Sequence, residues 1–117
     1  MPKFAARKDT NHRQIVVWLE GMGWTWRDTH RQGDGWPDGV AVYSRYSWLT
    51  VVVEIKSAGG KLEPDERRFW LTWPGLGAIL QTGEDARQLT VLAQEHALEP
   101  ERLGHELALR FVAPWIG

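Results

Sequence analysis

Apolar residues near the start of the chain recur at helical spacing. Four of them follow the i, i+3, i+4, i+7 pattern of one helical face: Ile15, Trp18, Leu19 and Met22. This pattern predicts a first helix over about 11–22, which ends at two glycines, Gly21 and Gly23. Three short polar side chains that can cap its free N–H groups stand at its start: Asp9, Thr10 and Asn11.

Runs of β-branched and aromatic residues indicate four strands farther along the chain. Their expected ranges are 24–29, 39–43, 48–55 and 77–81. The second and third are joined by a polar link at 44–47, which indicates a β-hairpin. The Gly-rich segment 32–37 before them is typical of a loop, because glycine and proline interrupt regular structure.

Two more helices are expected in the second half of the chain. One covers 64–73, since Pro64 suits the first helical turn, and the other begins at a capping box over 82–85 and ends near residue 97. A further helix around 102–109 is expected in the C-terminal extension, 99–117. The order αβββαβα predicts a single α/β domain in which helices flank one mixed sheet.

Length and composition narrow the class of protein. A chain of 117 residues fits one domain. The absence of cysteine excludes disulfides, thiolate nucleophiles and zinc–thiolate sites, so any metal must bind oxygen or imidazole ligands. No apolar run approaches the roughly 20 residues that span a bilayer, and the basic N-terminus lacks an apolar signal core. We therefore expect a soluble cytoplasmic protein with no membrane partner.

Charge and aromatic content suggest where a ligand would bind. The net charge of -1 argues against indiscriminate nucleic-acid coating, yet residues 1–31 carry six Lys or Arg against three acids, which favours a basic surface. The cations that flank the site proposed below are candidate phosphate contacts: Arg7, Lys8, Arg13, Arg27, Arg31, Lys61, Arg67 and Arg68. Most of the eight tryptophans are expected in the core, whereas Trp36, in the Gly-rich loop, is a candidate ligand contact.

Charged residues stand at the ends of the apolar hairpin strands. Alternate side chains of a strand share a face, so Glu54 and Lys56 point the same way, roughly 7 Å apart. Asp38 joins them if the hairpin pairs even positions with even ones, as a three- or five-residue loop or a bulge would allow. A four-residue loop that pairs Tyr43 with Trp48 would place Asp38 on the other face, and the sequence leaves both registers open.

Two carboxylates beside the Ile55 carbonyl would form an oxygen-rich pocket that suits Mg²⁺ or Mn²⁺. Such an ion polarises a phosphate oxygen and activates a water molecule. Lys56 could orient that water or neutralise the charge that builds on phosphorus. Together these groups would hydrolyse a phosphodiester. Simpler roles stay open: Asp38 as a turn residue, and Glu54 with Lys56 as a solvent-facing pair.

Glu66 is an auxiliary candidate on the helix expected at 64–73. It heads an apolar helical stripe formed with three aromatic residues: Phe69, Trp70 and Trp73. A buried charge is usually paired or bound, which suggests a place in the site. Ordinary helix N-terminal chemistry is the alternative explanation.

These residues resemble a known family. Pro37-Asp38 followed by Glu54-Ile55-Lys56 resembles the signature of the PD-(D/E)XK nucleases, and the element order is similar to their restriction-endonuclease-like αβββαβ core. The stretches "GWPDGVAV" and "VVVEIKSAGGKLEPDERRFWLTW" look like small phage and prophage nucleases of the VRR-NUC and Holliday-junction-resolvase-like branch. The resemblance runs from Arg7 to Leu89, within a core of about 7–97.

The resemblance implies roles for particular residues. Asp38, Glu54 and the Ile55 carbonyl would bind Mg²⁺ or Mn²⁺, and Lys56 would be the catalytic lysine. Relatives carry a supporting glutamate on the first helix; His12 occupies the comparable place here, with Asn11 or Asp9 as alternatives. The helix that contains Glu66 often points a polar side chain, commonly glutamine, toward the active site.

The activity that follows from this resemblance is a metal-dependent endonuclease acting on DNA, especially branched or otherwise structured DNA. It implies a homodimer in the cytoplasm of a bacterium or phage-infected cell. The sequence shows no base-reading motif, so we expect recognition of DNA shape. The alternatives are a nuclease-fold module that binds DNA or protein without cutting, and a small structural or regulatory phage protein.

Overall fold

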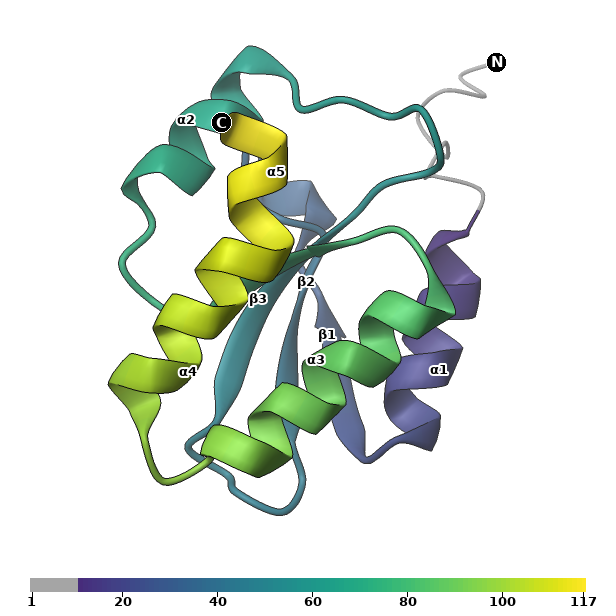
Figure 1. The fold of residues 1–117 in the computed structure, drawn as a ribbon. Coiled ribbons are helices and arrows are strands. Elements are labelled where there is room, and N and C mark those ends of the chain that lie inside the picture. Colours follow the sequence, from purple (N-terminus) through teal and green to yellow (C-terminus); the bar gives the residue numbers. More distant parts are fainter. Residues whose placement is uncertain (1–10) are drawn as a thin grey trace.

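A four-stranded mixed sheet runs through the computed structural model, which describes residues 11–117 (Figure 1). The strands, in sequence and in spatial order, are β1 (Trp24–Asp28), β2 (Gly39–Tyr43), β3 (Thr50–Ile55) and β4 (Gly77–Leu80). The first three are antiparallel, and β4 lies parallel to β3. The predicted α/β class, with helices around one mixed sheet, is confirmed.

Helices cover both faces of this sheet. The helical segments are α1 (His12–Gly21), a 3-10 turn η2 (His30–Gln32), α2 (Pro64–Thr72), α3 (Gly83–His96), α4 (Pro100–Leu107), a π-helical turn η3 (Ala108–Val112) and α5 (Ala113–Ile116). Helices α1 and α3 pack on one face, whereas α2 and α5 lie close together over the upper end of the other (Figure 1). Within the described residues no helix is long and apolar enough to cross a membrane.

Strand β3 is apolar from Val51 to Val53 and again at Ile55 because both of its faces are buried there. Val51, Val53 and Ile55 belong to the larger core against α1 and α3. Val52, between them, packs with Trp70 and the other residues of a smaller core under α2 and α5. A strand covered on both faces gives a continuous apolar run rather than an alternating one. Glu54 interrupts this run and is itself buried.

Several expected boundaries shift in the structure. Strand β3 begins at Thr50 rather than at residue 48, because Leu49 donates its N–H to the Tyr46 carbonyl in the hairpin turn. The helix expected at 102–109 begins at Pro100 and continues through η3 and α5 to Ile116. This longer C-terminal segment packs η3 against β4.

The expectation that most tryptophans lie in the core is wrong. Only three of the eight are buried: Trp24, Trp26 and Trp70. Three are more than a third exposed, namely Trp18, Trp36 and Trp48, and the other two are half-buried, namely Trp73 and Trp115. Membership of a regular element does not fix burial, because each helix and strand also has an outer face.

Gly39 opens β2 where the Trp26 ring packs on the strand. A Cβ built at Gly39 overlaps that ring, and Trp26 is itself buried, so neither group can move aside. We expect Gly39→Ala to lower the free energy of unfolding by about 3 kcal/mol, measured by urea denaturation. Gly21→Ala is the matched control, because a Cβ there meets nothing within 4 Å. Equal stability of both variants would contradict this packing.

Candidate functional site

The hairpin has the register that brings Asp38 to Glu54. Val40 pairs with Val52 and Val42 with Thr50, so even positions face even positions. Tyr43 donates its N–H to the Leu49 carbonyl, which leaves a five-residue loop over 44–48. Extending the same register by one step past Gly39 places Asp38 opposite Glu54. The open choice in the sequence is thereby resolved in favour of a shared face.

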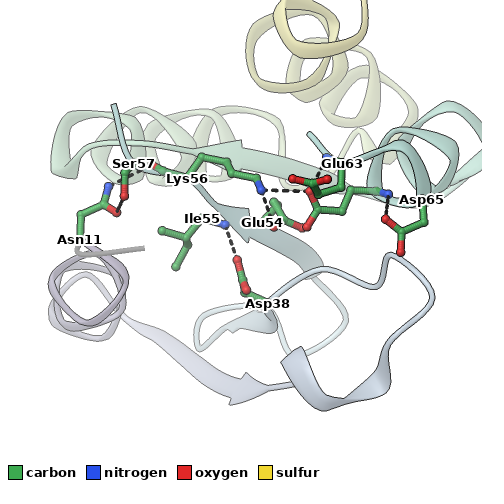
Figure 2. A network of polar contacts seen from close by, with 9 residues as sticks. Asn11, Asp38, Glu54, Ile55, Lys56, Ser57, Glu63 and Asp65 are labelled. Atoms are coloured by element: carbon green, nitrogen blue, oxygen red, sulfur yellow. Dashed lines mark hydrogen bonds and ion pairs between the residues drawn. The ribbon is translucent and has the colours of Figure 1, made fainter. Parts of the chain in front are cut away.

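Asp38 reaches across the end of the sheet to β3. Its Oδ2 accepts a hydrogen bond of 2.7 Å from the Ile55 N–H (Figure 2). Because the N–H and C=O of one strand residue point to the same side, the Ile55 carbonyl also faces the edge where Asp38 lies. Burial raises the pKa of Asp38, while the Ile55 N–H and the positive charges of His12 and Lys56 lower it. Asp38 is thus tied to β3.

Glu54 is a buried acid rather than a solvent-facing one. Glu54 lies on the central strand β3, and only 3 % of its surface is exposed. Burial, followed by the neighbouring carboxylates of Asp38 and Glu66, raises the pKa of Glu54 to about 10. A side-chain hydrogen bond between Glu54 and Asp38 also raises the pKa of Glu54. The solvent-exposed alternative for Glu54 is therefore wrong.

Lys56 lies between two acids. Its Nζ donates to Glu66 Oε1 at 2.9 Å. The same Nζ lies 3.8 Å from Glu54 Oε2 (Figure 2). The same Glu66 oxygen accepts the Glu63 N–H at 2.8 Å as part of the capping box of α2. Both interpretations of Glu66 therefore apply, since its carboxylate caps the helix and holds the lysine. Helix α2 orients Lys56 through this single oxygen.

Helix α1 contributes Asn11 and His12. The Asn11 Nδ2 donates to the main-chain carbonyls of Lys56 and Gln81, which follow β3 and β4. Asn11 therefore ties the ends of two strands to the start of α1. The sequence suggests Asn11 as a helix cap and as an alternative to His12, but its side chain makes no capping bond and instead positions the ends of β3 and β4.

His12 is buried at the start of α1. Its Nε2 lies 3.8 Å from Asp28 Oδ2, and its ring meets Trp26 edge-on. Its positive form lowers the pKa of Asp38, so the imidazole is within electrostatic range of the acid pair. His12 stays a candidate auxiliary group for the site. Asp9, the other alternative on this helix, lies outside the described residues.

The structure brings only some candidate nucleic-acid contacts together. Lys61 and Arg67 line one cleft. Four other candidates are exposed on α1, β1, η2 and α2, namely Arg13, Arg27, Arg31 and Arg68. Arg7 and Lys8 lie outside the described residues. Trp36 packs against Phe69 and Trp73, with ring centroids 5.2 and 5.9 Å away, and is 37 % exposed. Trp36 therefore supports α2 and still presents ring surface to solvent.

The residues near Asp38 offer one possible set of ligands for a hard divalent cation. Among residues 11–117 no group of three or more His, Asp or Glu side chains is arranged to hold a metal ion. A site would rest on two carboxylates, Asp38 and Glu54, and the Ile55 carbonyl. Mg²⁺ commonly binds through one or two carboxylates and keeps several waters. The Glu54 carboxyl, once ionised, would supply an oxygen ligand for such an ion.

Fold and side chains together define a mixed α/β protein with a buried glutamate, a partly buried aspartate beside it and a clamped lysine at one end of its sheet. No protein-family model matches the chain, and no curated protein and no solved structure is significantly similar to it. The site itself is therefore the basis for the function proposed below.

Proposed function

We propose that this protein is a metal-dependent endonuclease that hydrolyses DNA phosphodiester bonds, built on a restriction-endonuclease-like core. One observation carries the proposal: Glu54 is buried beside Asp38, next to a lysine held by Glu66. A buried carboxylate is costly unless a cation or hydrogen bonds compensate it, and burial here raises the pKa of Glu54 to about 10. Perturbed acids in such a place are typical of functional sites.

Asp38, Glu54 and the Ile55 carbonyl would hold the cation, Mg²⁺ or Mn²⁺. When bound, the ion supplies Lewis-acid polarisation of the phosphate and a lowered pKa of water. The positive charge would also let both carboxyls ionise, which burial opposes in its absence. The Ile55 N–H keeps the Asp38 carboxylate directed at the site.

Lys56 would act on the phosphate. Its ammonium is a point charge that Glu66 holds in place at the edge of the site. That charge can stabilise an oxygen that becomes negative during hydrolysis, or can orient the attacking water. Glu66 and the capping box fix the position of Nζ beforehand, so little side-chain entropy is lost on reaction.

The kind of DNA follows from the resemblance to resolvase-like nucleases and from the absence of a base-reading motif. Branched, flapped or otherwise structured DNA is the proposed substrate, and a homodimer would allow two strands to be cut. A DNA-binding module without activity is the alternative, and the assay below separates the two.

Cleavage of labelled linear, flapped and four-way-junction DNA with Mg²⁺, with Mn²⁺ and with EDTA tests the proposal. We expect metal-dependent cutting that Asp38→Asn reduces by more than about 100-fold, since even outer-shell partners of a metal contribute 10- to 100-fold. The matched control is Asp34→Asn, because Asp34 is exposed, has φ 55°, and asparagine tolerates that backbone. Binding without any cutting would replace the proposal by the DNA-binding alternative.

A further inference from the structure

A cleft of about 520 Å³ lies between the segment that follows β3, helix α2 and the C-terminal helix α5. Helices α2 and α5 approach each other at the same end of the molecule (Figure 1). The cleft is lined by Gly60, Lys61, Leu62, Arg67, Gln81, Pro114 and Trp115. This lining holds two cations, one amide, one indole ring and no acid.

The cleft adjoins the candidate active site. A Cβ at Gly60 would lie 3.5 Å from two carbons of the Lys56 side chain, so the cleft wall packs on the lysine stem. Arg67 follows Glu66, the residue that holds Lys56. Gln81 is fixed by its Nε2, which donates to the Ser57 carbonyl at 3.1 Å. The cleft therefore borders the Lys56 stem and the end of β3.

The charge of the cleft contrasts with that of the whole protein. The chain carries a net charge of -1, and 81–117 hold six acids against three Lys or Arg, yet none of those acids lines the cleft. Two cations without a counter-ion in the lining select an anionic ligand. The half-buried Trp115 offers a flat aromatic surface on which a base can stack.

We propose that this cleft binds a single-stranded segment of the nucleic acid, with phosphates on Lys61 and Arg67 and a base on Trp115. Pockets of roughly 300 to 1,000 Å³ take one small ligand, so the cleft suits one or two nucleotides rather than a duplex. This inference rests on the proposed function, because it assumes a nucleic-acid substrate. It gives the C-terminal segment a role, since α5 supplies Pro114 and Trp115.

Fluorescence anisotropy in EDTA tests the cleft without cleavage, using a labelled single strand, a blunt duplex and a duplex with a single-stranded flap. We expect the Lys61→Ala/Arg67→Ala variant to bind the single strand and the flap more weakly, with the salt slope reduced by about 1.4, or 0.7 per lost contact. Trp115→Ala should weaken the same two ligands by about 5- to 100-fold, the effect of losing one stacked base. Binding of the blunt duplex should be unchanged.

Two control variants lie at the other end of the hairpin. Arg45→Ala and Trp48→Ala remove an exposed cation and an exposed indole from the five-residue loop, and neither should alter binding. Trp115 also packs on the smaller core, so thermal melting must accompany its variant. Lys61 and Arg67 are exposed, so the variant that lacks both side chains is expected to fold. Its binding result therefore decides the test even if Trp115→Ala is unstable.

Two results would overturn the inference. In one, the Lys61→Ala/Arg67→Ala variant binds the single strand as tightly as the wild type does. In the other, this variant loses as much affinity for the blunt duplex as for the single strand. Its failure is distinguishable from failure of the proposed function. Metal-dependent cutting with no dependence on the cleft refutes the cleft alone. Cleft-dependent binding without any cutting supports the cleft and refutes the nuclease.

Discussion

Replacing Glu54 by glutamine is expected to stabilise the protein in EDTA increasingly as the pH rises. Relative to wild type, the variant should gain about 4 kcal/mol in the free energy of unfolding between pH 5 and pH 8. This gain corresponds to an increase in Tm on the order of 10 °C. Glutamine keeps the size and the polar end of the side chain, and it removes the group that burial disfavours in its charged form.

The sign follows from the two pKa values of Glu54. In the folded protein burial raises this pKa to about 10, whereas the ordinary value for glutamate is 4.5. Between these values the folded state holds one more proton than the unfolded chain, so stability decreases as pH rises, by about 1.4 kcal/mol per pH unit. The stability contributed by the protonated form is complete below pH 4.5 and is lost by pH 10.

Adding Mg²⁺ should offset about a third of this loss at pH 8, in the wild type only. An ion at ten times its dissociation constant adds about 1.4 kcal/mol by mass action, and it acts on the ionised acid pair. Thermal melting at pH 5 and pH 8, with EDTA and with Mg²⁺, measures both effects. Glu95→Gln, an exposed glutamate on α3, serves as the control. Parallel pH profiles of wild type and Glu54→Gln would show that Glu54 is ionised in the folded protein.

The fold was largely predictable because its signals are local. The strand over 39–43 is a short apolar run bounded by Pro37 and Ser44, so its ends were placed correctly. Pro64 and the capping box at Thr82 and Asp85 mark helix starts through contacts within one turn, and both are present. Such signals need no knowledge of the tertiary structure.

The register of the hairpin could not be predicted in the same way. The link around 44–47 is polar and permits either a four- or a five-residue loop, which place Asp38 on opposite faces. The choice depends on packing: Tyr43 and Leu49 are both buried in the larger core, and a five-residue loop puts both there. The face of Asp38 is thus set by residues far from the site.

The contacts around Lys56 could not be predicted from neighbouring residues in the sequence either. The distance between Lys56 and Glu66 along the chain says nothing about their ion pair, which depends on how α2 folds back over β3. Asn11 and Gln81 meet the end of β3 from still farther away in sequence. The residues of the acid pair could be identified from the sequence, whereas the groups that position them emerge only once the sheet is assembled.

Replacing Lys56 by alanine is expected to reduce the rate constant of DNA cleavage by about 100- to 1,000-fold under single-turnover conditions with saturating Mg²⁺. The side chain that donates toward the developing charge is lost, while the acid pair, Asp38 and Glu54, stays in place. Affinity for DNA, measured by anisotropy with EDTA, should change by less than about threefold, because a group that acts on the transition state contributes little to ground-state binding.

A purely structural lysine would behave differently. If Nζ served only to neutralise Glu54 and Glu66, its loss would lower Tm and weaken DNA binding along with cleavage. Arginine is not a conservative replacement here, because its planar fork does not match a site in which Glu66 accepts through one oxygen. Added methylamine should partly restore cleavage by Lys56→Ala, since the small ammonium can occupy the space left by the lysine end. Arg45→Ala is the control, and cleavage by Lys56→Ala within tenfold of wild type would exclude Lys56 as the catalytic lysine.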